Sequence, residues 1–349
     1  MTVNSRILHV MLAAGWMAAT ATAGVPPRLT ATFIQLTRAV ATNSVADWQA
    51  DLSRLKAAGI DTVLVQWAAE LPVAYFRADT NNLPGCNETY DTLETFFEAV
   101  KGSGLSVHLG LTSDPAYWKA ITARDRLLRD YFLLRVARNE KLQLQLLERF
   151  GDRPEWVGYY IPDEIDDLTW RAPSHGAYLR DYLALMTQRL RTNDAARTVA
   201  VSAFFRGRTA PATFARTLLT LTSNAVSRVD TLLIQDGAGV GDPPVAYMPA
   251  YFKTLHELWP AGAPHLWGVV ELFEQTSRGT EPFAAVPAQP ARVAGQIASI
   301  APDVERLVAF TVKDYADPAR GPAAAALYRL LSEPAAPRSS DAAAAGSTP

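Results

Sequence analysis

The chain has 349 residues, of which 49% are apolar, and its formal net charge is −2. This composition is that of a globular protein with a sizeable core, and the length suits one large domain or two ordinary ones. Nucleic acid and anionic membranes attract proteins with a clear basic excess, so neither is expected as a partner of this nearly neutral chain. Its single cysteine, Cys86, excludes an intramolecular disulfide.

The N-terminus has the pattern of a secretory signal peptide. Arg6 precedes an apolar run that ends in Ala21-Thr22-Ala23, a small-x-small pattern that predicts cleavage near Ala23. The run is short for a helix that spans a bilayer, which needs about 20 residues, and an uncleaved anchor is the alternative. We therefore expect residues 1–23 to be removed and the mature protein to be periplasmic or secreted, with no membrane contact after cleavage.

Eight apolar runs have the character of buried parallel strands. Most are continuous rather than alternating, as strands covered on both faces are, and several are rich in β-branched residues. The predicted strands are residues 31–36, 61–67, 106–112, 156–161, 198–205, 230–235, 265–273 and 306–315.

Segments with helical periodicity follow these runs. The first helix is expected to begin after the N-cap residue Ser44 and to end at Gly59. Eight alternating strand and helix units predict one α/β domain, a (β/α)₈ TIM barrel, over residues 24–333. An open doubly wound sheet is the alternative, but no Gly-x-Gly-x-x-Gly turn follows the first run. Residues 334–349, which are mostly Ala, Ser and Pro, are expected to be a disordered tail.

The carboxyl ends of the predicted strands are rich in carboxylate, amide and aromatic side chains. In a barrel these ends meet at one mouth, where active sites lie. Carboxylates and amides bind sugar hydroxyls and aromatic faces stack on sugar rings, so this mixture predicts a carbohydrate substrate. The residues expected to contact it are Gln35, Gln66, Trp67, Tyr160, Asp163, Phe205, Asp236 and Tyr315. The alternatives are core packing for each aromatic, mutual hydrogen bonding for the glutamines, and capping for the aspartates.

Two glutamates are the candidate catalytic residues. Glu164 follows an apolar run and Pro162, which cannot donate a ladder hydrogen bond and is expected to end the strand. Glu271 interrupts another apolar run, and it is expected to face a polar cavity because a buried carboxyl without a partner is costly. Glycoside hydrolysis needs two carboxyl groups across the scissile bond. The alternative is a structural ion pair with Lys313 or Arg206.

Other kinds of site are not favoured by the sequence. No histidines occur as a His-x-His or His-x-x-x-His pair, and no Gly-x-Ser-x-Gly elbow is present, so we expect no metal, no other cofactor and no serine nucleophile. The glycine-rich residues 237–241 lead into two prolines rather than into a helix, which indicates a mobile loop and not a phosphate-binding turn.

Four stretches of the predicted barrel are distinctive together: ATFIQL (31–36), GIDTVLVQW (59–67), GYYIPDEID (158–166) and WGVVELF (267–273). They resemble those of domain of unknown function 4434, a family placed among TIM-barrel glycoside hydrolases, and the resemblance spans roughly residues 29–331. It implies a barrel and a glycosidase activity.

The resemblance also implies roles for the two glutamates. In retaining glycosidases with related barrels, the acid/base glutamate follows strand four and the nucleophile follows strand seven, which are the places of Glu164 and Glu271. Those enzymes usually carry Asn where this chain has Asp163, a departure that affects the contact to the sugar 2-hydroxyl.

We therefore expect a monomeric glycoside hydrolase that cuts a poly- or oligosaccharide by a two-carboxylate, retaining mechanism. One alternative is a non-catalytic carbohydrate-binding barrel in polysaccharide assembly or export. Another is a structural barrel whose mouth is covered by a partner protein.

Overall fold

The computed structural model of the chain describes residues 27–123, 125–223, 229–279 and 281–333. The expected signal peptide, residues 1–23, and the expected tail, residues 334–349, lie outside the described residues. None of the helices in the described ranges combines the length and the apolar character that crossing a membrane requires.

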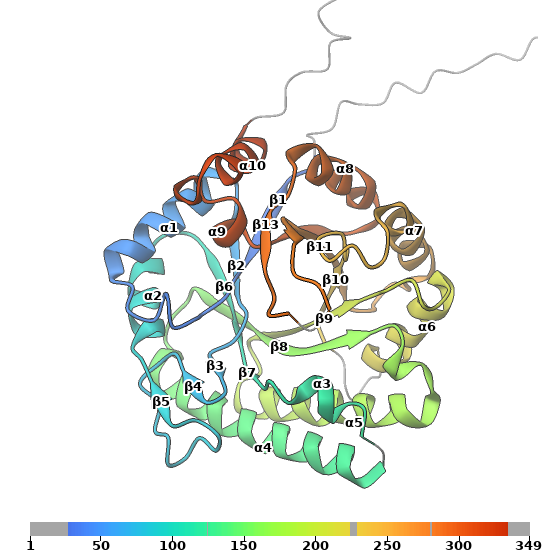
Figure 1. Cartoon of the computed structure of the whole chain (residues 1–349). Coiled ribbons are helices and arrows are strands. Elements are labelled where there is room, and N and C mark those ends of the chain that lie inside the picture. The colour runs from blue at the N-terminus through green and yellow to red at the C-terminus, as the bar shows by residue number, and fades with distance from the viewer. Residues whose placement is uncertain (1–26, 124, 224–228, 280, 334–349) are drawn as a thin grey trace, which may run out of the picture. The chain divides into compact units, whose positions relative to one another are not determined.

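Eight parallel strands close into a barrel that is surrounded by helices (Figure 1). The order around the barrel is β1-β14-β11-β10-β9-β8-β6-β2, so strands that follow one another in this set are also neighbours in space. The predicted (β/α)₈ barrel is confirmed. The barrel strands are β1 (Leu29–Ile34), β2 (Thr62–Val65), β6 (Ser106–Gly110), β8 (Trp156–Asp166), β9 (Thr198–Phe204), β10 (Thr231–Gln235), β11 (His265–Glu271) and β14 (Arg306–Phe310).

One long helix follows each barrel strand within the described residues. The first begins as predicted, because Ser44 and Asp47 form a capping box in which each side chain accepts the backbone N–H of the other. Gly59, just past this helix, has a φ of +86°, a left-handed conformation that ends a helix and suits glycine. The eight helices are α1 (Val45–Ala57), α2 (Thr92–Val100), α4 (Asp125–Phe150), α5 (Pro173–Asn193), α6 (Pro211–Thr222), α7 (Met248–Leu258), α8 (Pro290–Ile300) and α10 (Pro322–Ser332).

Short elements decorate the end of the barrel at which the strands finish. In Figure 1 the β12–β13 hairpin and helix α3 lie in front of the barrel, so this view faces the mouth. The short strands are β3 (Ala69–Glu70), β4 (Val73–Ala74), β5 (Glu88–Thr89) and β7 (Thr112–Ser113), which form one small sheet, and the hairpin strands β12 (Phe273–Gln275) and β13 (Ala285–Pro287). The short helices are α3 (Tyr117–Ala120), α9 (Val312–Tyr315) and the 3₁₀ turns η1 (Thr169–Arg171), η2 (Val245–Tyr247), η3 (Ala301–Asp303) and η4 (Pro318–Arg320).

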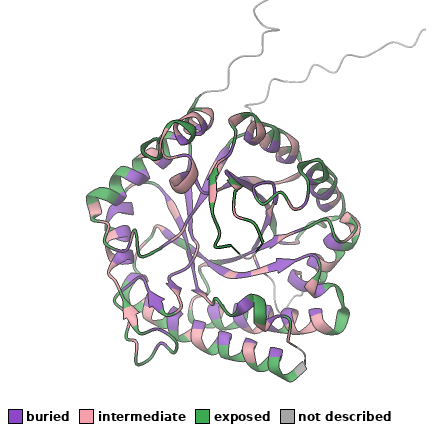
Figure 2. Ribbon diagram, in the orientation of Figure 1, coloured by how far each residue is buried: buried purple, intermediate pink, exposed green. Residues whose placement is uncertain are grey.

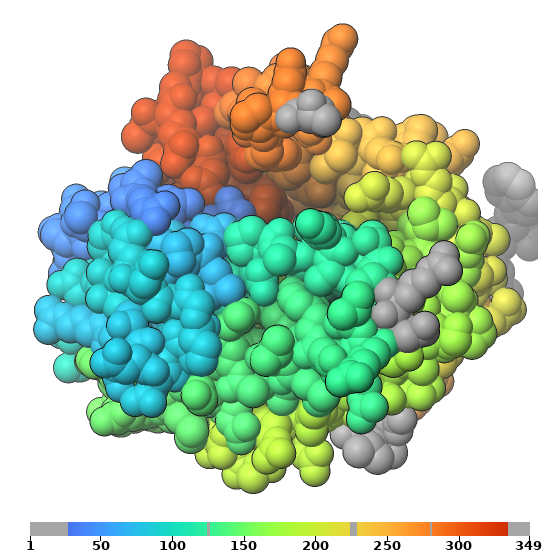
Figure 3. Space-filling model, turned by 60° about the horizontal axis from the view of Figure 1, so that its bottom comes forward, coloured from blue at the N-terminus to red at the C-terminus, as the bar shows by residue number. Residues whose placement is uncertain are grey.

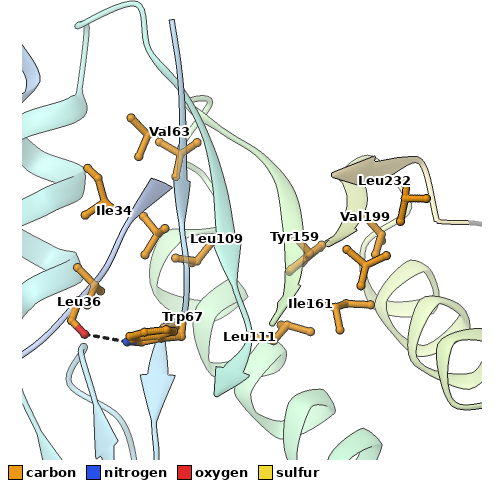
Figure 4. Packing of buried hydrophobic residues seen from close by; sticks show 14 of the residues in the cluster. Ile34, Leu36, Val63, Trp67, Leu109, Leu111, Tyr159, Ile161, Val199 and Leu232 are labelled. Atoms are coloured by element: carbon orange, nitrogen blue, oxygen red, sulfur yellow. Dashed lines mark hydrogen bonds between the residues drawn. The ribbon is translucent and has the colours of Figure 1, made fainter. Parts of the chain in front are cut away.

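The barrel strands separate two apolar cores. Inward-facing side chains fill the barrel; they are Ala31, Phe33, Leu64, Tyr160, Ala200, Leu233, Val269 and Val308. Outward-facing side chains pack against the buried faces of the helices (Figure 2). Figure 4 shows part of this outer core, in which Trp67 Nε1 donates to the Leu36 carbonyl oxygen at 2.7 Å. Successive side chains of a strand face opposite sides, so alternation decides which residues at a strand end enter the mouth.

Two strand ends differ from the sequence-based prediction. β8 does not end at Pro162: it continues four residues further, and its register with β9 shifts just past Ile161. Such an irregularity accommodates a proline, because the bulged residues need no ladder hydrogen bond. β14 ends at Phe310 rather than at Tyr315, because Thr311 Oγ1 caps helix α9 by accepting a backbone N–H of that helix.

Candidate active site

Glu164 lies at the mouth end of β8 and is half-buried. Its Oε1 accepts a hydrogen bond from Gln235 Nε2 at 2.7 Å, so the side chain reaches across β9 to β10. The Tyr117 hydroxyl donates to the Glu164 carbonyl oxygen at 2.7 Å and fixes the backbone. Burial raises the pKa of Glu164, and the Gln235 hydrogen bond and the positive charge of Arg206 oppose that rise. The carboxyl is therefore suited to keep a proton at a pH where an exposed glutamate has lost it.

Glu271 is the last residue of β11 and is 4% exposed. Its Oε2 accepts the backbone N–H of Gly239 at 2.6 Å and that of Val240 at 3.2 Å. These donors belong to the glycine-rich residues 237–241, so this loop holds the carboxyl. A Cβ on Gly239 would lie 2.6 Å from the Phe273 carbonyl oxygen and 2.9 Å from Glu271 Oε2, which is why the loop needs glycine there.

Asp236 lies behind Glu271 and is fully buried. Its carboxylate accepts the Glu271 N–H at 3.4 Å, the Ala238 N–H at 3.1 Å and Gln296 Nε2 of α8 at 2.5 Å. The expectation that Asp236 contacts substrate is wrong, because it faces the helices, where it positions the backbone of Glu271. Burial raises the pKa of Asp236 to about 6. Burial and the charge of Asp236 raise the pKa of Glu271 to about 8, although the two backbone N–H donors and the charge of Arg292 act to lower it. Glu271 therefore keeps its proton to a higher pH than an exposed glutamate does.

Gln35, Gln66 and Tyr315 lie at the mouth, where the sequence predicted them; their contact with a substrate stays a prediction. Gln35 and Gln66 are half-buried and follow inward-facing residues of β1 and β2. Gln66 Oε1 is buried and accepts no hydrogen bond from the described residues, so it can accept one from a ligand hydroxyl. Tyr315 packs against Phe273, with ring centres 5.2 Å apart, and burial, with lesser contributions from charges that include Glu271, raises its pKa to about 12.

The expected contacts of Phe205 and Tyr160 are wrong, because both rings are core residues. Phe205 faces the helices and stacks on Tyr251 with ring centres 4.0 Å apart. Tyr160 is 1% exposed inside the barrel, where its hydroxyl shares a 2.7 Å hydrogen bond with Ser202 Oγ. Trp67 also belongs to the outer core, although it lines the cleft described below.

Asp163 lines the cleft described below, but its carboxylate is engaged within the protein, so its contact with a substrate stays a prediction. Its carboxylate is 2% exposed, pairs with Arg135 at 2.7 Å and accepts the Tyr182 hydroxyl. Arg135 is itself buried and also donates to the Thr112 carbonyl oxygen at 2.6 Å. Asp163 thus forms an ion pair with Arg135 of α4 and anchors the backbone just before Glu164.

A cleft of about 160 Å³ opens beside Glu164. In Figure 3 the green segment that includes α3 lies on one side of a hollow and the orange β12–β13 hairpin stands on the other. The residues that line the cleft are Gln66, Trp67, Ser113, Asp114, Tyr117, Trp118, Pro162, Asp163 and Glu164. A larger hollow of about 410 Å³ lies between α4 and α5, and neither Glu164 nor Glu271 lines it.

Sequence reasoning missed three residues of the mouth. Gln235 holds Glu164, and Phe204 lies edge-on to Trp118 with ring centres 5.7 Å apart. Strand alternation would have found the first two, since Gln235 and Phe204 share a face with inward residues of β10 and β9. Trp118 lies on the short helix α3, for which the sequence gives no comparable periodicity.

The alternative of a structural ion pair is not realised. Neither Glu164 nor Glu271 takes part in an ion pair within the described residues. Lys313 instead pairs with Asp51 of α1. Over the same ranges, no group of three or more His, Cys, Asp and Glu side chains is arranged to hold a metal ion.

Known proteins share both the sequence pattern and the fold. The family model described as domain of unknown function (DUF4434) matches residues 29–325. The uncharacterized protein YbcH of Escherichia coli is 28% identical over 252 residues, which cover 72% of this chain and 78% of that protein.

Two solved structures are similar in fold. The crystal structure of "a putative alpha-L-fucosidase" from Bacteroides thetaiotaomicron has a TM-score of 0.71 at 16% identity, covering 89% of this chain and 97% of that one. A second structure, described as "Glycoside hydrolase", has a TM-score of 0.52 at 14% identity, covering 88% and 67%. At these identities the likeness shows a shared TIM-barrel fold, whereas the family match extends over most of the sequence. The chain belongs to the DUF4434 family.

Proposed function

We propose that this protein is a glycoside hydrolase whose two reacting groups are Glu164 and Glu271. The observation that carries the proposal is the pair of carboxyls at the mouth, from β8 and β11, whose pKa values are raised and which are held by amide donors rather than by cations. Glu164 lines the polar cleft, and carboxyls with raised pKa values beside such a cleft are typical of active sites. The fold shared with proteins described as glycoside hydrolases supports the same reaction class.

The proposed mechanism is a double displacement with retention. Glu164 donates its proton to the glycosidic oxygen as that bond breaks, and Glu271 attacks the anomeric carbon to form a glycosyl ester. Water, deprotonated by Glu164, then attacks the same carbon and releases Glu271 as the carboxylate. A nucleophile must be ionised, and the Gly239 and Val240 N–H groups favour that form of Glu271 while Asp236 opposes it. The positive charge that develops on the sugar in the transition state favours the ionised form of Glu271 further.

Azide rescue of truncated variants tests these roles. Wild type, Glu164→Ala and Glu271→Ala are assayed on a panel of 4-nitrophenyl glycosides that includes the α-L-fucoside, and on polysaccharides with a reducing-end assay. We expect both variants to be inactive on polysaccharides, whereas Glu164→Ala should still form the glycosyl ester from 4-nitrophenyl glycosides, because their leaving group needs no proton. Azide replaces the missing nucleophile in Glu271→Ala and gives a glycosyl azide of inverted anomeric configuration. In Glu164→Ala it attacks the glycosyl ester and gives a glycosyl azide of retained configuration.

The outcomes separate the possibilities. Exchanged product configurations would reverse the two roles, and wild-type activity of Glu271→Ala would end the assignment. Binding of a polysaccharide by wild type without new reducing ends would favour the non-catalytic carbohydrate-binding barrel instead.

We also propose that the protein acts outside the cytoplasm as a monomer. The signal-peptide pattern of residues 1–23 supports export. N-terminal sequencing of the periplasmic and secreted fractions should find a chain that starts just after Ala23, and light scattering should give the mass of one chain. An intact N-terminus in the cytoplasmic fraction alone would overturn the proposed location.

A further inference from the structure

A cationic side chain stands at the mouth beside Glu164. Arg206 follows β9, is exposed, and contributes a positive charge at Glu164. Its guanidinium lies over the ring of Phe204, 5.3 Å from the ring centre. No carboxylate of the described residues lies within ion-pair distance of Arg206. The charge of this guanidinium is therefore available to a ligand.

The loop that carries Arg206 is held in place. Asp167 is 2% exposed, and its carboxylate accepts the backbone N–H groups of Arg206 at 3.2 Å, Arg208 at 3.0 Å and Thr209 at 3.3 Å. A backbone fixed in this way limits the conformational entropy that is lost when the side chain binds a ligand.

Aromatic rings adjoin the guanidinium on the side of the cleft. Phe204 contacts both Arg206 and Trp118, and Trp118 is 44% exposed and lines the cleft together with Glu164. An exposed tryptophan face can stack on a sugar ring. A sugar stacked there would present its substituents to the neighbouring guanidinium.

The nearby carboxylates are already engaged. Asp114 pairs with Arg138 at 3.2 Å, and Asp163 pairs with Arg135. Asp166 accepts two backbone N–H groups of the following turn, at 2.7 and 2.6 Å. These carboxylates thus have partners of their own, whereas Arg206 forms no ion pair within the described residues.

We propose that Arg206, Phe204 and Trp118 form a subsite for a sugar unit that bears a carboxylate, which makes uronic-acid-containing glycans the substrate class. A guanidinium matches a carboxylate through two parallel hydrogen bonds, a geometry that a neutral hydroxymethyl group cannot provide. This inference rests on the proposed function, because it names the substrate of the same mouth.

Matched acidic and neutral oligosaccharides test the proposal. Calorimetry on the Glu271→Gln variant of the full chain, which binds without turnover, would use oligosaccharides from alginate, polygalacturonate and hyaluronan. The neutral partners are the same oligosaccharides after chemical reduction of their carboxyl groups. We expect at least one acidic oligosaccharide to bind about 10- to 100-fold more tightly than its reduced partner, the range typical of a charge-assisted contact.

The control variants separate charge recognition from general effects. Adding Arg206→Gln should remove most of this preference and leave binding of the reduced partner unchanged. Arg208→Gln should keep the preference, because Arg208 is exposed and pairs with Asp242. Equal binding of acidic and reduced partners, or equal weakening of both by Arg206→Gln, would overturn the proposal. Binding or cleavage of neutral glycans alone would overturn this inference but not the glycosidase function, and no binding or cleavage of any glycan would count against both.

Discussion

The electrostatic environment of Glu271 can be tested by removing one neighbouring charge. Asp236→Asn keeps the size of the buried side chain and its acceptor oxygen but makes it neutral. The charge of Asp236 is, after burial, the second cause that raises the pKa of Glu271 to about 8. We therefore expect Asp236→Asn to lower the pKa of Glu271, while burial keeps it above the ordinary value of 4.5.

The expected size of the fall in the Glu271 pKa follows from the relative weight of burial and of the Asp236 charge. A rise from 4.5 to about 8 favours the protonated form by about 5 kcal/mol, at about 1.4 kcal/mol for each pKa unit. A neighbouring charge typically moves a carboxyl pKa by roughly 1–3, and burial is the larger cause here, so we expect a fall of about 1–2.

Carbon NMR of protein labelled at the glutamate side-chain carboxyl carbon measures this pKa directly, and Glu271→Gln identifies the signal. Asp194→Asn is the matched control, since Asp194 is a partly buried carboxylate paired with Arg197 near the start of β9, at the opposite end of the barrel. It should leave the Glu271 titration unchanged. An unchanged or higher Glu271 pKa in Asp236→Asn would refute the reasoning.

Three further predictions concern stability and the loop. The folded-state pKa of Glu271 is raised from 4.5 to about 8, so wild type loses stability as the pH rises through that window. The stability of Glu271→Gln relative to wild type, measured in thermal melts, should therefore increase by about 2–4 kcal/mol from pH 5 to pH 8. The same stability difference at both pH values would contradict this. Arg135→Leu leaves the buried carboxylate of Asp163 unpaired and should lower the free energy of unfolding in urea by about 3–5 kcal/mol. Arg191→Leu, which breaks a partly exposed ion pair, should lower it by less than about 1 kcal/mol. Equal losses of stability in the two variants would argue against this reasoning. Gly239→Ala should push the loop off Glu271 and lower kcat about 10- to 100-fold on any substrate found, whereas Gly295→Ala, with open space at its Cβ, should not; full activity of the former would show that the loop contact is dispensable.

Local patterns in the sequence were sufficient for the architecture. Continuous apolar runs alternate with amphipathic segments, and burying both kinds at once leaves few arrangements other than a closed barrel. The N-cap at Ser44 and the end of the helix near Gly59 are equally local, and both were predicted. Placing Glu164 and Glu271 at one mouth followed from the rule that the carboxyl ends of parallel strands point the same way.

The tertiary structure alone decided which strand-end residues enter the mouth and which partners they meet. Trp67, Phe205 and Asp236 face the helices because a single step along a strand reverses the direction of the side chain. Asp163 looked free in the sequence because its partner, Arg135, lies 28 residues away on another element. The raised pKa values of Asp236 and Glu271 depend likewise on burial and on contacts across strands. Once one inward-facing residue of a strand is known, the sequence predicts the direction of the others. Partners distant in the sequence and the loss of solvent around a side chain arise only in the folded chain.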